Sequence, residues 1–401
     1  MAGPAPWLRH LAQELLARML GGIEVGTLTV SLPGGARLRY AAPQTGPEAV
    51  LVLHRWRALR RLATGGDIGF AEAYLDQDWS SPDPVALLEL AARNLSCIPG
   101  ATGGPLPVRL WHRLRHRARR NTRAGSRRNI MAHYDLGNDF YARWLDAGMS
   151  YSSGLYADPS VDPVAELDAA QAEKQARVLA WLDLQPGQQV LEIGCGWGGL
   201  AESIAAAGAQ VTGLTLSPAQ WEYATARIAR AGLDRRAELR LQDYRDVEGC
   251  FDRIVSIEMI EAVGEAYWPT YFATLRDRLT RNGIVVLQAI TIADNAFDTY
   301  RRGTDFIQHA IFPGGMLPSP GAIAALAERH GLAVRARESF GDSYARTLAA
   351  WRARFNAAWP GIAAMGFSPC FRRLWDYYLA YCEAGFRAGR VDVGLWRLEP
   401  R

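Results

Sequence analysis

The clearest chemical signal in the sequence is a glycine-rich turn that directly follows an acidic residue. The stretch QVLEIGCGWGG at 189–199 carries Glu192 in an apolar run and then four glycines, Gly194, Gly196, Gly198 and Gly199. Glycine accepts positive φ and lets the backbone pass close to a ligand, and a helix after the turn offers unpaired N–H groups. A strand, a glycine turn and a helix in this order predict a nucleotide-type pocket at the edge of a parallel sheet.

Strands and helices must alternate around this turn to position it. Hydrophobic patterning predicts strands at 189–194, 209–216, 237–243, 252–258 and 283–291, with helices at 198–207, 218–231 and 267–280. This alternation predicts an α/β fold with a doubly wound parallel sheet, whose ligand crevice lies at the carboxyl ends of the strands. Two later strands, at 332–340 and 391–398, are expected to add an antiparallel edge.

The sequence divides into three predicted parts. Residues 1–98 form a small N-terminal α/β domain, with a helix at 4–20, short strands within 23–40 and helices at 49–64 and 83–95. Residues 99–128 form a Pro/Gly-rich and then arginine-rich linker, and residues 129–401 form the catalytic domain. A chain of 401 residues is long enough for two such domains.

Composition narrows the class of protein. A hydrophobic content of 49% with 21% charged residues is typical of a globular protein. The sequence contains neither an apolar run of ~18 residues nor a signal-peptide pattern, so we expect a cytoplasmic protein. The five cysteines form no CxxC pair, which predicts reduced thiols and no metal site.

The linker ends in a dense positive segment. Residues 109–128 contain nine arginines and no acidic residue, with Leu110, Trp111 and Leu114 among them. A run of this kind is attracted to an anionic surface, which is either lipid headgroups or nucleic acid. The apolar residues favour an interfacial helix, but composition alone does not separate the two partners.

The second predicted strand helps to identify the cofactor. A dinucleotide site requires an acidic residue at the end of that strand, and GLTLS stands there instead. This argues against NAD and favours S-adenosylmethionine in a class I methyltransferase fold. Asp243 follows the third strand and is either a turn residue or an adenine contact, and its place in the crevice favours the contact.

Several ordered motifs resemble one family. They are HYDLGNDFY, the YSSG loop, LEIGCGWGG, GLTLSPAQ, LQDYRD, FDRIVSIEMIEAVG, FPGGMLPS and EAGFRAGRVDVGLW. Together they resemble the cyclopropane-fatty-acid-phospholipid synthases and their mycolic-acid relatives over residues 129–398. The segment GFAEAYLDQDW resembles the additional N-terminal domain of the bacterial phospholipid enzymes.

The resemblance implies a set of cofactor-binding residues. Carried over by position, the S-adenosylmethionine site consists of Tyr151, Ser152, Gly194, Gly196, Thr215, Leu216, Gln220, Tyr244, Arg245 and Ile257. It also implies a substrate, an unsaturated acyl chain within a membrane phospholipid. The arginine-rich segment would then hold the enzyme peripherally at the inner face of the membrane.

In the family that the chain resembles, a bound bicarbonate is the catalytic base. A cysteine, a glutamate, a histidine, an isoleucine backbone and a tyrosine hold it. The corresponding positions here are Ser153, Glu261, Gln288, Ile290 and Tyr344. Serine and glutamine still hydrogen-bond an anion, but glutamine carries neither a proton nor a charge. The sequence therefore leaves open whether bicarbonate binds.

The fate of the substrate depends on the base. Methylation of an alkene leaves a carbocation, which aromatic faces and carboxylates stabilise. Loss of a proton from the new methyl group closes a cyclopropane, and loss from a neighbouring carbon gives a methylated unsaturated chain. A saturated methyl branch requires a separate reductase. Glu258, at the end of the fourth predicted strand, is a further candidate in the crevice.

Three other functions compete with this hypothesis. A nucleic-acid methyltransferase would carry an N/D-PP-Y/F motif after the fourth strand, where SIEM stands, so we expect no nucleic-acid partner. The other two are methylation of a non-lipid small molecule and a catalytically impaired lipid-binding homologue. The assembly stays open between a monomer and a homodimer.

Overall fold

The computed structural model describes residues 20–95 and 136–401, together with Glu14, Leu16, Cys97, Thr122 and Gly125. The predicted helix at 4–20 lies outside the described residues apart from Glu14, Leu16 and Leu20, and the arginine-rich segment at 109–128 does so apart from Thr122 and Gly125. The predicted domain limits at 98 and 128 also lie outside the described residues, and they remain predictions.

The larger of two sheets has seven strands in the order β10-β11-β9-β8-β5-β6-β7. Its parallel part consists of β5 (Gln189–Ile193), β6 (Gln210–Thr215), β7 (Ala237–Leu241), β8 (Phe251–Ile257) and β9 (Leu279–Ile292). β11 (Val391–Pro400) pairs antiparallel with β9, and β10 (Leu332–Ser339) pairs antiparallel with β11. The predicted fold class and antiparallel edge are therefore confirmed.

Helices cover both faces of this sheet. Alternate residues of β5 belong to different cores, since Val190 packs with α7 (Leu167–Leu182) and α8 (Gly199–Ala206), whereas Leu191 packs with α11 (Trp268–Arg278) and α13 (Pro320–Arg329). The remaining helices of this part are α6 (Asn138–Ala142), α9 (Pro218–Arg230), α10 (Ile260–Val263) and α12 (Asp294–Tyr300), with short turns at Tyr244–Asp246, Glu265–Tyr267 and Ile307–Ile311. Burial of both faces explains why the central strands β5, β8 and β9 are largely apolar.

The smaller sheet has four strands in the order β2-β1-β3-β4. They are β1 (Val25–Ser31), β2 (Arg37–Ala41), β3 (Gln44–Leu53) and β4 (Trp79–Ser80), and α2 (Arg57–Leu75) and α3 (Pro84–Arg93) accompany them. The prediction of a helix from residue 49 was wrong, because residues 49–53 alternate between buried and half-buried in β3. The helix begins only at Arg57 and continues to Leu75 through a kink at Gly66.

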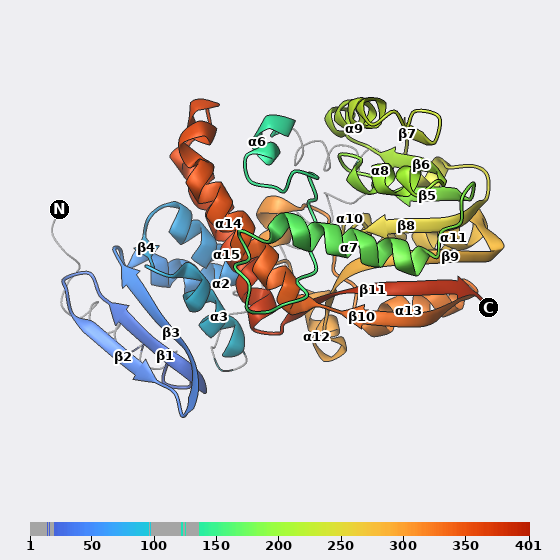
Figure 1. Ribbon diagram of the computed structural model, residues 1–401. Coiled ribbons are helices and arrows are strands. Elements are labelled where there is room, and N and C mark those ends of the chain that lie inside the picture. Colours follow the sequence, from blue (N-terminus) through green and yellow to red (C-terminus); the bar gives the residue numbers. More distant parts are fainter. Residues whose placement is uncertain are drawn as a thin grey trace.

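Two long helices connect the sheets (Figure 1). α14 (Gly341–Ala364) and α15 (Pro369–Arg387) contact one another, and α15 also packs on α2 and α3. Across this contact, Tyr74 donates to Asp376 at 3.3 Å and Arg373 donates to the carbonyl of Leu75 at 2.9 Å. The smaller sheet is thus tied to the catalytic part through α15.

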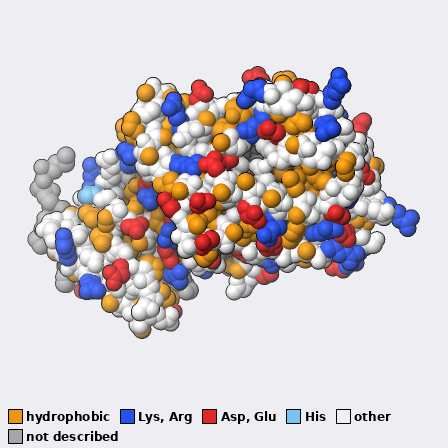
Figure 2. All heavy atoms as spheres, viewed as in Figure 1, with side chains coloured by type: hydrophobic (Ala, Val, Ile, Leu, Met, Phe, Trp, Pro, Cys, Tyr) orange, Lys and Arg blue, Asp and Glu red, His pale blue; other side chains and the backbone are white. Residues whose placement is uncertain are grey.

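The described surface carries mixed charge. Figure 2 shows acidic and basic side chains interspersed over the face that it presents. Within the ranges that the structure describes, no helix is long and apolar enough to cross a membrane.

Candidate active site

The glycine turn lies at the carboxyl end of β5, where the strand order reverses between its neighbours β6 and β8. Gly194 has φ +85°, and a Cβ there would lie 3.0 Å from Cγ of Met259. Gly196 has φ +51° and opens toward free space. The backbone N–H groups of Gly194 and Cys195 donate to the carbonyl of Leu214, which ties the turn to β6. This is the predicted location for a nucleotide-type cofactor.

One cavity of about 930 Å³ joins this turn to an apolar interior. Most of the predicted cofactor residues line it, namely Tyr151, Ser152, Gly194, Gly196, Thr215, Leu216, Gln220, Tyr244 and Ile257. Asp243 and Arg245 are not among the lining residues, and their side chains form an ion pair at 2.6 Å. Their predicted role in cofactor binding remains a prediction.

Hydrogen bonds fix the polar part of this wall. Thr215 and Gln220 are both buried, and the Thr215 hydroxyl donates to the Gln220 amide oxygen at 2.9 Å. Ser217 caps α9 by accepting from the backbone N–H of Gln220. The cap places Gln220 in the first turn of α9, facing the end of β6.

The interior of the cavity is apolar and extends into the N-terminal part. Leu59, Leu62 and Ile68 of α2 line it together with Leu87 and Leu88 of α3. A volume of this size lies at the upper end of the range for small-molecule sites, which is about 300–1,000 Å³. The cavity therefore has room for a long apolar ligand next to the cofactor turn.

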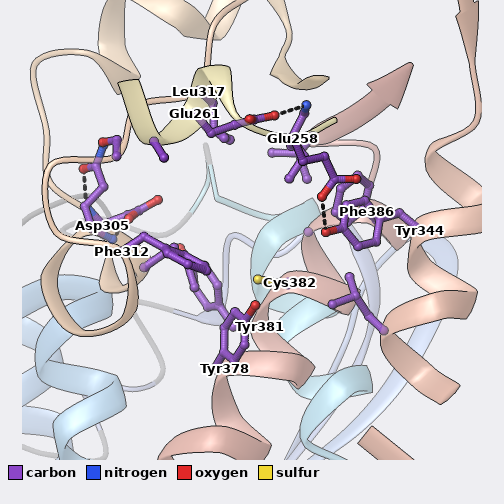
Figure 3. A pocket seen from close by; sticks show the side chains of 18 of the residues that line it. Glu258, Glu261, Asp305, Phe312, Leu317, Tyr344, Tyr378, Tyr381, Cys382 and Phe386 are labelled. Carbon is purple, nitrogen blue, oxygen red and sulfur yellow. Dashed lines mark hydrogen bonds between the residues drawn. The ribbon is translucent and has the colours of Figure 1, made fainter. Parts of the chain in front are cut away.

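Two carboxyl groups lie at the junction between the cofactor crevice and the apolar interior (Figure 3). Glu258 follows β8 and has φ +49°, a left-handed conformation that is uncommon for a residue other than glycine. Glu261 lies in α10, and its carboxyl Oε1 accepts from the backbone N–H of Ile290. In Figure 3, Tyr378 and Tyr381 lie across the cavity from these carboxyl groups.

The carboxylate of Glu258 receives three hydrogen bonds. Its Oε1 accepts from the backbone N–H of Ser153 at 2.9 Å and from Nε2 of Gln288 at 2.7 Å, and its Oε2 accepts from the hydroxyl of Tyr344 at 2.6 Å. Burial raises the pKa of Glu258, while these donors act in the opposite direction. Burial, together with the neighbouring charge of Glu258, raises the pKa of Glu261 to about 8.

The structure places the five residues that were predicted to surround a bicarbonate in two hydrogen-bonded groups. Ser153, Gln288 and Tyr344 meet at Glu258, while Glu261 and Ile290 meet each other. The hydroxyl of Ser153 points elsewhere and donates to the carbonyl of Gly154 at 2.8 Å. A bicarbonate does not fit this arrangement, because side chains of the protein already occupy the donors that would bind it.

A buried lysine beside the cofactor crevice was missed by the sequence reasoning. Lys174 of α7 is 4% exposed, and its ammonium donates to the hydroxyl of Ser152 at 2.8 Å. Burial lowers the pKa of Lys174, and Glu258, Asp146 and Glu192 oppose this shift. The sequence did set this residue apart, because Lys174 is the only lysine. Every other basic side chain is an arginine or a histidine.

S-adenosylmethionine fits the crevice at the glycine turn. Glu192 lines the cavity beside this turn, and its Oε2 is buried without a hydrogen-bond partner among the described residues. Burial raises the pKa of Glu192 to about 8, although Lys174 acts in the opposite direction. An unpartnered carboxyl oxygen, glycines that allow close approach and the half-buried ring of Tyr244 suit a ligand with amine and purine groups.

Comparisons with known proteins agree with this site. A family described as mycolic acid cyclopropane synthetase matches residues 121–396. The chain is 42% identical over 354 residues to the tuberculostearic acid methyltransferase UfaA1 of Mycobacterium tuberculosis, which covers 87% of this chain and 82% of that protein. It is 37% identical over 344 residues to the cyclopropane-fatty-acyl-phospholipid synthase of Escherichia coli K12, with 84% of both chains covered.

A solved structure extends the comparison to three dimensions. The mycolic acid cyclopropane synthase CmaA1, complexed with SAH and CTAB, superposes with a TM-score of 0.62 at 29% identity. The superposition covers 68% of this chain and 97% of that one. The chain therefore belongs to the mycolic acid cyclopropane synthetase family and is an S-adenosylmethionine-dependent fatty acid C-methyltransferase.

Proposed function

We propose that the chain methylates a carbon of the double bond in an unsaturated acyl chain of a membrane phospholipid. The observation that carries this proposal is one continuous cavity, which runs from the glycine turn to the leucines of α2 and α3. An acyl chain in the apolar part would present its double bond next to the methyl donor. The names of the relatives, a tuberculostearic acid methyltransferase and a cyclopropane-fatty-acyl-phospholipid synthase, support the same substrate class.

The residues at the glycine turn would hold the cofactor, which supplies an electrophilic methyl group. Tyr151, Thr215, Gln220 and Tyr244 line this end of the cavity and are the proposed contacts, with Asp243 and Arg245 flanking it. An alkene is a weak nucleophile, so orientation and exclusion of water must supply much of the rate. The apolar walls meet both requirements, because they confine the chain and exclude solvent.

Aromatic side chains near the junction would stabilise the carbocation that methylation leaves. Tyr151 and Tyr378 both line the cavity, and their hydroxyls share a hydrogen bond of 2.9 Å. This bond fixes the direction of both rings, whose faces attract positive charge. Loss of a proton from the cation then gives a cyclopropane or a methylated alkene.

The arginine-rich segment would bring the enzyme to its substrate. The nine arginines at 109–128 would attract anionic headgroups at the inner face of the membrane, at about 1 kcal/mol per basic residue near the surface. Sedimentation with anionic vesicles, and its loss at high salt, tests this step. Replacement of the nine arginines by glutamine should weaken vesicle binding without changing cofactor affinity.

Transfer of a labelled methyl group tests the proposed reaction. The enzyme is incubated with methyl-labelled S-adenosylmethionine and vesicles of monounsaturated or fully saturated phospholipid. Label should enter the acyl chains of the unsaturated lipid alone. NMR of the released fatty acid distinguishes ring protons from vinylic protons and thus names the product. Label in added RNA, or in neither lipid, would contradict the proposal.

A further inference from the structure

We infer that the carboxylate of Glu258 is a built-in catalytic base that takes the place of a dissociable bicarbonate. This inference rests on the proposed function, since it names the group that completes that reaction. It is carried by the contacts of Glu258 and by the conformation of its backbone. The identity of residue 258 would then decide whether the enzyme depends on bicarbonate.

The backbone directs the Glu258 side chain into the site. The φ of Glu258 is +49°, which is disfavoured for any residue that bears a Cβ. The backbone N–H of Glu258 donates to the carbonyl of Gln288 at 2.8 Å, and this bond fixes the backbone. A conformation of this kind persists only where the surrounding structure enforces it, and such positions cluster at functional sites. A glycine would adopt the same φ without strain but would bring no carboxylate.

The donors around Glu258 form a complete anion site. A backbone N–H, an amide and a phenol hydroxyl hold its two oxygens, and each donor comes from a different part of the chain: Ser153, Gln288 and Tyr344. The ammonium of Lys174 adds a favourable charge. A free anion such as bicarbonate would have to displace the Glu258 carboxylate, which is part of the chain and already accepts these three hydrogen bonds.

Charge balance in the site favours Glu258 as the ionised carboxyl. Burial raises the pKa of both Glu192 and Glu261 to about 8, so these two groups are largely protonated at neutral pH. Glu258 has three hydrogen-bond donors, whereas Glu192 Oε2 and Glu261 Oε2 have no partner among the described residues. Among Glu258, Glu192 and Glu261, the hydrogen bonds therefore single out Glu258 as the carboxylate that the charge of Lys174 stabilises.

The reaction balances with Glu258 as the proton acceptor. The π electrons of the alkene form the new bond to the methyl carbon while the bond from that carbon to sulfur breaks. A C–H bond of the resulting carbocation then breaks, and its electrons close the ring or form the new double bond. A Glu258 oxygen receives the proton, which later passes to solvent. Each turnover consumes one sulfonium and releases one proton, without an oxidant or a reductant.

Two substitutions at residue 258 test this inference. Glu258→Gln keeps the shape but cannot accept the proton, and it should lower kcat by at least about 100-fold with or without bicarbonate. Glu258→Gly frees the donors of Ser153, Gln288 and Tyr344, so its activity should return when bicarbonate is added. Glu222→Gln, an exposed change on α9, is the control and should behave as wild type. Wild-type activity that disappears in bicarbonate-free buffer, or a Gln variant with normal kcat, would overturn the inference.

Two readouts do not depend on activity. In the presence of S-adenosylhomocysteine, the ¹³C NMR line of labelled bicarbonate should broaden on binding to Glu258→Gly. The same line should stay sharp with the wild type. Lys174 as sole lysine gives a single ¹³Cε NMR signal, and its pKa should fall in Glu258→Gln because a neighbouring negative charge is lost. Bicarbonate binding to the wild type, or an unchanged Lys174 pKa, would contradict the inference. If no lipid is methylated, the proposed function fails, while these two measurements still decide the role of Glu258.

Discussion

The buried carboxyl group of Glu192 should make the folded protein less stable as the pH rises. The residue is 3% exposed at the end of β5, and burial raises its pKa from an ordinary 4.5 to about 8. In the unfolded chain the carboxyl loses its proton near 4.5, whereas the folded protein retains it to about 8. The stability that Glu192 contributes is therefore complete below 4.5 and is lost as the pH rises to about 8.

The size of this effect follows from the shift. Each pKa unit corresponds to about 1.4 kcal/mol, so the shift of Glu192 corresponds to roughly 3–5 kcal/mol between about pH 4.5 and 8. Replacement by glutamine, which has nearly the same shape and does not titrate, removes this dependence. The variant should be about as stable as the wild type at low pH and more stable at high pH.

Urea unfolding of the cofactor-free protein measures this difference. Wild type and Glu192→Gln are unfolded at about pH 5 and at about pH 9, and the unfolding free energies are compared at each pH. Other buried acids titrate in both proteins, so they cancel in the comparison. Glu222→Gln on the surface of α9 should follow the wild type at both values. An equal difference between wild type and Glu192→Gln at the two pH values would refute the reasoning.

Three further predictions follow from the structure. Gly194→Ala should weaken binding of S-adenosylhomocysteine by at least about tenfold in calorimetry, because its Cβ would crowd Cγ of Met259 at a positive φ. Gly232→Ala, at a positive φ in open space, should not weaken it. Leu62→Trp should reduce methyl transfer to long acyl chains by filling the apolar cavity, with cofactor affinity unchanged, and Leu241→Trp on the surface is its control. Asp78→Asn should cost about 2 kcal/mol in urea unfolding, because the buried carboxylate binds partly exposed arginines.

The main sheet could be predicted from the sequence because its central strands are buried on both faces. Runs such as IVVLQAI have no polar alternation, and glycine turns and amphipathic helices separate them. The N-terminal part offered weaker signals. Residues 49–53 lie in β3, and the helix that was expected from residue 49 begins only at Arg57. The predicted end at 64 lies next to the kink at Gly66, beyond which α2 continues to Leu75.

The sequence predicted which residues belong to the site, but not how their side chains contact one another. The family resemblance implied that Ser153, Gln288 and Tyr344 share one site, and in the structure all three donate to Glu258. Glu258 was expected only as a further candidate in the crevice, and its contacts with these three residues were not predictable, because the direction of its side chain depends on a positive φ. A backbone dihedral of this kind arises from tertiary contacts and leaves no local pattern.

The single lysine links composition to chemistry in this protein. Arginine remains charged at any physiological pH and carries a bulky planar head, so it suits surface ion pairs and anionic partners. Lys174 is buried, donates to the hydroxyl of Ser152 and lies close enough to nearby carboxyl groups to interact with their charge. A lysine ammonium is more compact than a guanidinium, and its pKa shifts readily when it is buried. A chain that otherwise uses arginine throughout therefore retains lysine where the methyl transfer site needs a small buried cation.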